Sequence, residues 1–254
     1  MTKQSGVGVE RLVISGVDVS GNIGAVDTIR VGANLVDHTD ITQYAVDRRK
    51  LLSDGEVTFK AWWDGTPSTG VNEVFKALPS AASVAFTHGF AVASPAACVV
   101  GAQTNYDITR SPEGTLAATI NVQSTTGAPL EWGFTLTTAA STPWQTFASA
   151  GNGSDVDDLG GSPTSTAFGG ILYVHCLSLG SGSFTAKVQD AATLPTYSDV
   201  SGLVTGTINA VGATRVVTTT TTTTIRRYTR VVLSGTFSNA AVLAVLVRPM
   251  AAQA

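Results

Sequence analysis

Apolar and polar residues alternate through most of the chain in short runs separated by Gly, Ser, Asn and Asp. Alternation with a period of two is typical of strands with one buried face, and the separating residue types favour turns. In the first half the pattern is found at residues 9–19, 23–33, 83–86, 97–108, 115–122 and 132–136. The pattern therefore predicts a mainly β chain.

Residues 36–62 predict a long β-ribbon. Residues 36–46 are polar and lack a clean apolar face, whereas residues 56–62 alternate as a strand should. Between them, Asp54-Gly55 is a strong hairpin-turn signal. The middle of this ribbon is too polar to belong wholly to a core.

One short helix is predicted. An apolar pattern at helical spacing follows a start signal at residues 67–70 and ends before Pro79; its members are Val71, Val74, Phe75 and Leu78. We expect about two turns of helix.

The second half predicts a separate β domain. Residues 138–168 are rich in Ala, Ser, Thr and Gly, which is typical of a linker. Strands are predicted beyond it at 170–179, 183–190, 202–208, 215–223, 226–234 and 242–248. Their regular spacing indicates a sandwich or jelly roll. We expect one domain over 1–140, a linker and domain entry over 141–168, and a C-terminal β-sandwich over 169–254.

The run of seven threonines at 218–224 is of low complexity, which allows disorder or a glycosylated stalk. Threonine is a good strand former, and the flanks Val216-Val217 and 225–232 are strand-like. We therefore expect an edge strand or hairpin here.

The composition suits a protein that is covered by neighbours. Only 13% of the residues are charged, 43% are hydrophobic, and the formal net charge is −3. The acidic excess lies in residues 1–137, and neither half has the basic excess of a protein that grips nucleic acid.

Side chains that carry chemistry are few and scattered. His38, His88 and His175 lack the spacing of metal ligands, and Cys98 and Cys176 are predicted to be buried thiols in different domains. No nucleophile elbow or phosphate-binding loop is found in the sequence. We expect no catalytic, cofactor-binding or metal-binding residues, and no enzyme.

Residues 155–158 form the densest acidic cluster, Asp-Val-Asp-Asp. With Asn152 nearby it offers oxygen ligands for calcium, but the twelve-residue loop with its final Glu is missing. A solvated linker and a calcium loop both stay open.

The longest apolar run, residues 240–247, is far too short to span a bilayer. The opening residues lack the basic-then-apolar layout of a signal peptide. We expect a protein that is made and used in a soluble state, without a membrane partner.

Residues 5–137 resemble the siphophage major tail protein, or tail tube protein, family. The segments that carry the resemblance are 16–21, 40–42, 51–55, 106–110 and 130–137. Each segment is a turn signature made of common residues, and the resemblance rests on the order in which the segments follow one another. The second half resembles jelly-roll domains appended to phage tail proteins and adhesins, on residues 171–175, 184–190 and 226–231.

The resemblance implies an N-terminal tail-tube β-sandwich or barrel with one short helix, and a C-terminal jelly-roll-like domain on the tube exterior. In the family, six subunits form a ring whose inner strands join into a barrel, and rings stack through a long β-ribbon into the tube of a non-contractile tail. The implied location is the virion, assembled in the host cytoplasm. The implied partners are other copies, a tape-measure protein, tail terminator and tip proteins, and double-stranded DNA that passes without specific binding.

The same resemblance gives the ribbon a role as an arm that reaches a neighbouring ring. Arg48, Arg49, Lys50 and Asp54 are then candidates for the contact between rings. A solvated surface hairpin is the plainer interpretation of these residues. For the whole chain, the alternative is a carbohydrate-binding or adhesion β-sandwich protein whose second half is the active part.

Overall fold

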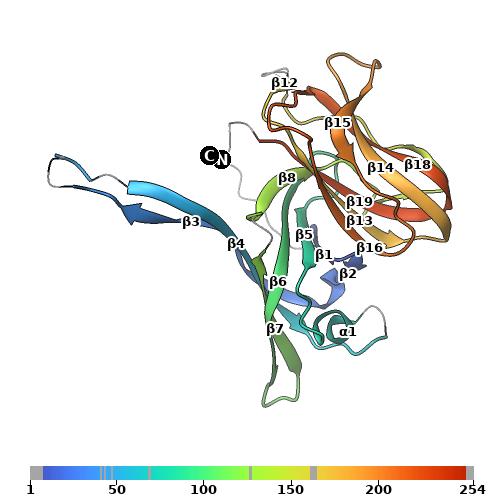
Figure 1. Cartoon of the computed structure of the whole chain (residues 1–254). Coiled ribbons are helices and arrows are strands. Elements are labelled where there is room, and N and C mark those ends of the chain that lie inside the picture. The colour runs from blue at the N-terminus through green and yellow to red at the C-terminus, as the bar shows by residue number, and fades with distance from the viewer. Residues whose placement is uncertain are drawn as a thin grey trace. The chain divides into compact units, whose positions relative to one another are not determined.

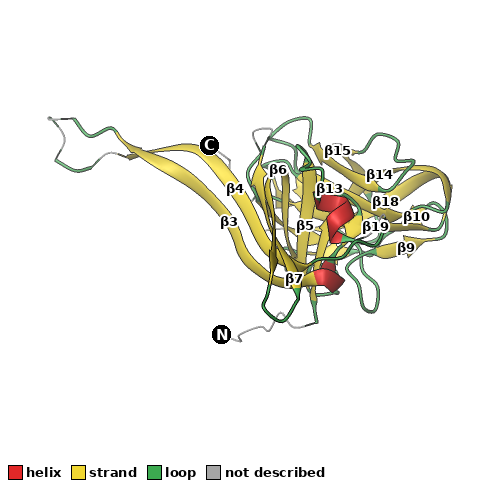
Figure 2. Cartoon of the chain, turned by 90° about the horizontal axis from the view of Figure 1, so that it is seen from below, coloured by secondary structure: helices red, strands yellow, loops and turns green. Residues whose placement is uncertain are grey.

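The computed structural model describes residues 8–40, 42, 44–46, 48–67, 70–125, 128–160 and 165–249. The chain is mainly β, as predicted, with one short α-helix and one 3-10 turn, η1 (Ser20–Asn22) (Figures 1 and 2). Contacts divide it into two compact units. We call Met1–Gly21, Ser83–Cys98 and Trp132–Ala254 the sandwich unit, and Asn22–Ala82 with Val99–Glu131 the ribbon unit.

The ribbon unit is an antiparallel sheet with one helix. Its elements are β3 (Ile23–Asp37), β4 (Arg48–Trp62), α1 (Val71–Phe75), β7 (Leu116–Ser124) and the greater part of β6 (Pro95–Arg110). The strands pair in the order β3-β4-β7-β6. Phe59 of β4 faces Ile120 of β7, and both are buried. Phe59 also packs against Phe75 of α1, with ring centroids 5.5 Å apart, so the helix closes a small core over one face of the sheet.

The predicted helix exists but is shorter than expected. It spans five residues, and Gly70 at its N-terminus offers no side chain to cap the free backbone N–H groups. Leu78, predicted to lie on its apolar face, has a left-handed φ of 48° and is half exposed. Of the helix residues, Val71 and Phe75 are buried.

The sandwich unit contains the remaining strands, which are β1 (Glu10–Ile14), β2 (Val17–Asp18), β5 (Ala82–His88), β8 (Glu131–Thr135), β9 (Gln145–Phe147), β10 (Gly151–Asn152), β11 (Val156–Asp157), β12 (Ser165–Thr166), β13 (Ile171–Ser178), β14 (Ser181–Ala191), β15 (Ser198–Val204), β16 (Gly212–Val217), β17 (Ile225–Arg226), β18 (Tyr228–Ser238) and β19 (Ala240–Val247). One sheet contains β16-β13-β19-β8, and a second runs β10-β18-β14-β15. Their facing side chains, among them Leu172, Phe184 and Leu246, form one apolar core. Four of the six strands predicted beyond residue 169 are confirmed, as β13, β14, β18 and β19. The predicted ranges 202–208 and 215–223 overlap β15 and β16 only in part, because β15 ends at Val204 and β16 ends at Val217.

Strand β13 is buried on both faces, which explains its nearly unbroken apolar sequence. Leu172 points into the sandwich core, while Tyr173 and His175 are buried on the other face. The turn before β2 lies against that strand: a Cβ at Gly16 would come within 2.4 Å of the Cys176 carbonyl oxygen, and Gly16 has a φ of 87°. Glycine is therefore required at this contact.

Part of the segment expected to be a linker pairs with later strands. β9 pairs with β19, and β10 and β11 pair with β18. That residues 169–254 form a domain of their own stays a prediction.

The prediction of a strand at Thr218–Thr224 is wrong. β16 ends at Val217 and β17 begins at Ile225, and the threonines between them form a turn. The Thr218 hydroxyl accepts a hydrogen bond from the Gly170 N–H at 3.2 Å and donates to the Thr220 carbonyl at 3.0 Å. Hydroxyl bonds to nearby backbone compete with a strand ladder, which outweighs the strand propensity of threonine here.

Candidate assembly surfaces

The β3–β4 hairpin extends beyond the sheet to which it belongs. β4 pairs with β7 only from Glu56 to Trp62, whereas its pairing with β3 continues outward from Val31↔Gly55 to Asp37↔Arg48. Figures 1 and 2 show these two strands leaving β7 as a separate two-stranded ribbon. We call residues 31–37 and 48–55, with their connecting turn, the arm.

Large apolar side chains on the arm are exposed. Val31 is 48% exposed and Leu35 is 60% exposed, and Val46 in the connecting turn is also exposed. A two-stranded ribbon has no second layer in which to bury such groups and is marginally stable alone. Contiguous exposed apolar side chains commonly mark an interaction site. The arm is therefore a candidate interaction surface.

The arm leaves the sheet at Gly55. A Cβ at Gly55 would lie 2.2 Å from the Leu130 backbone nitrogen, so the chain segment before β8 crosses directly over this residue. Asp54 beside it accepts hydrogen bonds from the Gly55 N–H at 2.7 Å and the Ser124 hydroxyl at 2.9 Å. The prediction of a hairpin turn at Asp54-Gly55 is therefore wrong. The glycine serves a close crossing in the middle of β4, and the chain reverses between Asp37 and Arg48 instead.

The four predicted contact residues lie in two places. Arg48 and Arg49 are exposed near the tip of the arm, where Arg48 faces Asp37 and Arg49 faces Val36. Lys50 is in the same strand, but its side chain lies outside the described residues. Asp54 lies at the base, six residues from Arg48, which is about 20 Å along a strand. The structure thus brings the two arginines together and separates Asp54 from them.

Strand β3 also has a free edge. Its 15 residues pair with β4 on one side, and no other strand of the described chain pairs with it. An exposed edge presents a row of unpaired backbone N–H and C=O groups, which is a template for a further strand. Proteins blunt such edges when they must stay apart, and this one is long.

The solvent-facing side of the ribbon unit's sheet is polar and internally bonded. The Asn121 amide donates to Glu56 at 2.7 Å and to the Thr58 hydroxyl at 2.8 Å, and its oxygen accepts from Thr104 at 3.0 Å. Arg30 extends this network with an ion pair to Glu56 at 2.9 Å. This face was not predicted from the sequence, although the alternation of Glu56, Thr58 and Lys60 is the signal that could have identified it.

The three histidines lie in different environments and do not form one site. His38 is exposed, His88 lies 3.4 Å from the Glu10 carboxylate, and His175 is fully buried. The His175 Nε2 is 3.4 Å from the Ser83 hydroxyl, and burial lowers the pKa of its ring to about 4. Among the described residues no group of three or more His, Cys, Asp or Glu is placed to hold a metal ion.

Both cysteines are buried, and neither is part of a disulfide bond. Burial raises the pKa of Cys176 to about 11, and its sulfur contacts the Ser178 carbonyl oxygen at 3.5 Å. A thiol with a raised pKa is a poor nucleophile, so this group serves packing.

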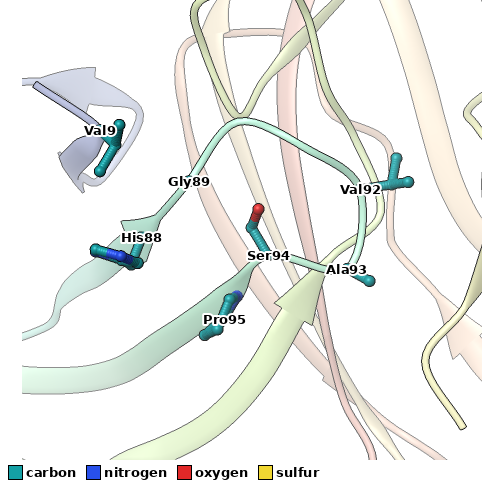
Figure 3. Close-up of a pocket in the computed structure, with 7 residues that line it drawn as sticks. All are labelled: Val9, His88, Gly89, Val92, Ala93, Ser94 and Pro95. Atoms are coloured by element: carbon teal, nitrogen blue, oxygen red, sulfur yellow. The ribbon is translucent and has the colours of Figure 1, made fainter. Parts of the chain in front are cut away.

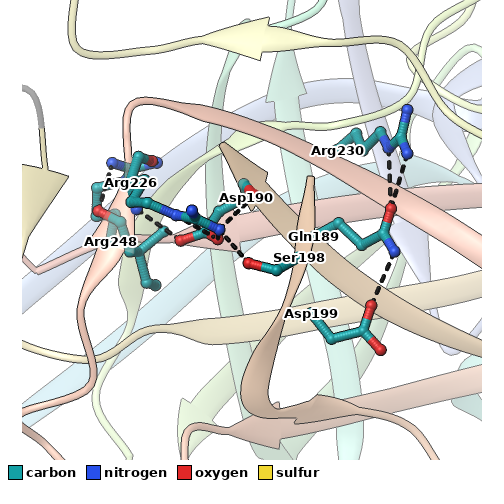
Figure 4. Close-up of polar contacts among 8 residues, drawn as sticks. Gln189, Asp190, Ser198, Asp199, Arg226, Arg230 and Arg248 are labelled. Atoms are coloured by element: carbon teal, nitrogen blue, oxygen red, sulfur yellow. Dashed lines mark hydrogen bonds and ion pairs between the residues drawn. The ribbon is translucent and has the colours of Figure 1, made fainter. Parts of the chain in front are cut away.

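The acidic cluster at 155–158 is matched by arginines rather than open to a cation. Asp157 accepts from the Arg227 Nε at 2.9 Å, which holds the pKa of its carboxyl below the ordinary value. Asp158 pairs with Arg248 at 3.0 Å. Figure 4 shows a comparable pairing nearby, in which Arg226 points at the Asp190 carboxylate. Only the carboxylates are recognisable as a cluster in the sequence; their partners come from distant strands.

One hollow of the sandwich unit, of about 510 Å³, lies at the β5–β6 turn (Figure 3). Its walls are mainly small or apolar residues, including Gly89, Val92 and Ala93. His88 and Ser94 supply its polar side chains, and His88 already faces Glu10. This hollow offers no evident set of catalytic groups.

No helix among the described residues is long and apolar enough to cross a membrane.

Comparisons with known proteins give weak likenesses. No protein-family model and no curated protein matches the sequence. Among solved structures, the Dit (gp 19.1) protein of phage SPP1, described as a hub of the adsorption apparatus in phages that infect Gram-positive hosts, has a TM-score of 0.32 and 11% identity, over 94% of this chain and 98% of that one.

Two structures of the phage p2 baseplate in its activated conformation, with Sr and with Ca, have TM-scores of 0.32 and 0.34 and identities of 10% and 9%. Each match covers 95% of this chain and 99% of the other. These values are too low to assign this chain to a family or to a role.

Proposed function

We propose that this chain is a non-enzymatic structural subunit of a phage tail, and that copies of it assemble through the arm and the free edge of β3. The arm carries the proposal. It is a ribbon with exposed apolar side chains and no second layer, so its residues gain a buried environment only against another molecule. Because residues 5–137 resemble the tail tube family, we infer that the molecule covering the arm is a second copy of this chain.

The free edge of β3 supplies the contact within a ring. In a closed ring, each copy's edge strand pairs with a strand of the next copy, and closure leaves no edge exposed. Six copies per ring is the number that the resemblance implies. The polar face around Asn121, with Glu56, is suited to line a water-filled lumen, since its side chains are already bonded to one another.

The arm then supplies the contact between rings. Arg48 and Arg49, with Lys50, would pair with acidic side chains of the next ring, because among the described residues neither arginine has an ion pair of its own. Asp54 is better explained as a local brace of the arm, since its Oδ1 is already bonded to Gly55 and Ser124. Stacked rings of this kind would form a tail tube, with the tape-measure, terminator and tip proteins as further partners and DNA passing through.

Electron microscopy of the purified chain tests this function. We expect rings or hollow tubes, and tubes in particular if the arm joins rings. The variant Arg48→Glu/Arg49→Glu/Lys50→Glu should form rings that do not stack, because reversed charges repel the acids that the arm meets. The matched variant with Gln at the same three positions should stack weakly.

Discrete monomers at high concentration would contradict assembly altogether. Full-length tubes from the charge-reversed variant would show that these three residues do not form the contact between rings. Single rings from the unaltered chain would contradict the stacking of rings into a tube but would agree with assembly into a ring.

A further inference from the structure

A second cavity of the sandwich unit, of about 370 Å³, combines an exposed indole with a buried ion pair. It is lined by Trp132, Gly133 and Phe134 of β8, by Asp158 and Leu159 after β11, and by Arg248 after β19. Ligand pockets are commonly about 300–1,000 Å³ in volume, with apolar walls and a few fixed polar groups. This cavity has that composition.

The close packing of β8 on β19 holds the indole at the rim. A Cβ at Gly133 would come within 2.5 Å of the Leu246 carbonyl oxygen, so only glycine allows the two strands to approach. Residues alternate along β8, with Glu131 buried and Trp132 52% exposed. The indole is therefore presented outward from a rigid strand rather than from a loop.

The ion pair forms the inner wall. The Arg248 side chain is 1% exposed and that of Asp158 is 11% exposed, with Nη2 and Oδ1 3.0 Å apart. Arg248 also donates to the carbonyl oxygens of Ile225, at 3.4 Å, and Arg226, at 3.1 Å. Within the described part of the chain its Nε has no hydrogen-bond partner, and the Asp158 Oδ1 contact is an ion pair without hydrogen-bond alignment.

Polar atoms of a buried ion pair that lack hydrogen bonds lower the stability of the fold. Loss of water around both groups also disfavours their charged forms. Burial raises the pKa of Asp158 and lowers the pKa of Arg248. Groups in this state gain most from a ligand that supplies the missing hydrogen bonds. Such a ligand must also fit a site with no net charge, because the charges of Asp158 and Arg248 cancel.

These features select the chemical class of the ligand. An anion would meet the Asp158 carboxylate and a cation would meet Arg248, so a net charge is disfavoured. An apolar ligand would leave the ion pair unmatched. A neutral compound with several hydroxyl groups and one apolar face satisfies both parts of the cavity.

We propose that this cavity binds a neutral saccharide, whose apolar ring face packs on Trp132 and whose hydroxyl groups hydrogen-bond to Asp158 and Arg248. Hydroxyl groups donate to the carboxylate and accept from the guanidinium, which a single sugar ring can do with two neighbouring hydroxyls. This inference does not depend on the assembly of copies.

Binding is tested with the full chain and a panel of glucose, galactose, mannose, rhamnose and N-acetylglucosamine at millimolar concentrations, by ligand-observed NMR. At least one sugar should bind, and inorganic phosphate should not compete with it. Trp132→Ala should weaken binding by about tenfold or more. Trp62→Ala is the matched control, because Trp62 of the ribbon unit is also 52% exposed and should have no effect.

Asp158→Asn keeps the shape of the side chain and should also abolish binding, with circular dichroism to show that the variant is folded. If that variant unfolds, the Trp132 and Trp62 variants decide the matter alone. The inference is overturned if no sugar of the panel binds, if Trp132→Ala binds as the unaltered chain does, or if Trp62→Ala loses binding equally.

Discussion

His175 is a fully buried residue whose ionisation is tied to the fold. It lies in β13 and is fully buried, and its Nδ1 has no hydrogen-bond partner among the residues that the structure describes. Nothing in the sequence distinguished it from an ordinary strand histidine. Its surroundings come from Ser83 and from strands distant in sequence, which pattern alone does not bring together.

Acid should destabilise the protein through this ring. The pKa of His175 falls from the ordinary 6.5 to about 4 because burial disfavours the charged form. The neutral ring's contribution is therefore complete above pH 6.5 and is lost as the pH falls from 6.5 through 4, by about 3 kcal/mol in all.

Urea unfolding across that window should show the loss, and His175→Gln should show a flatter pH dependence whatever its absolute stability. Parallel pH profiles for the two proteins would mean that His175 does not bind a proton on unfolding.

At the scale of elements, the β3–β4 hairpin offers a direct test of how the arm leaves the sheet. Gly55→Ala should destabilise the protein by about 1–3 kcal/mol, because the new methyl group would overlap the backbone of Leu130. Gly32→Ala is the matched control on the facing strand, with no atom within 4 Å of its added Cβ, and should change stability by less than about 0.5 kcal/mol. Chemical denaturation measures both, and equal effects would contradict the crossing at Gly55.

The same elements show what pattern can and cannot predict. Strands were found wherever apolar residues alternate or run together, and the helix was found from Val71 and Phe75. The turn at Asp54-Gly55 was misplaced because the local signal of that dipeptide says nothing of Leu130, which crosses it from 75 residues further along. The threonine run was misassigned because hydroxyl bonds, and not propensity, decide its conformation.

At the scale of the whole molecule, residues that are consecutive in the sequence do not always belong to the same compact unit. Each compact unit is assembled from separated stretches, and β6 passes from one unit into the other. Composition places boundaries where a chain becomes rich in Gly and Ser, but it does not report that β9 to β11 pair with β18 and β19. Of the candidate surfaces, the ribbon and its arginines were predicted from the sequence. The polar face, the free edge of β3 and the Trp132 cavity were not predicted.

The central claim is that strand β3 obtains its missing partner from another copy. Hydrogen exchange at residues 23–32 of the assembled protein tests it most directly, with the same protein diluted until it dissociates as the unassembled reference. The β3 amides that do not bond to β4 should exchange at least about tenfold more slowly in the assembly than in the dissociated protein. Equal, fast exchange of those amides in both states would contradict the account.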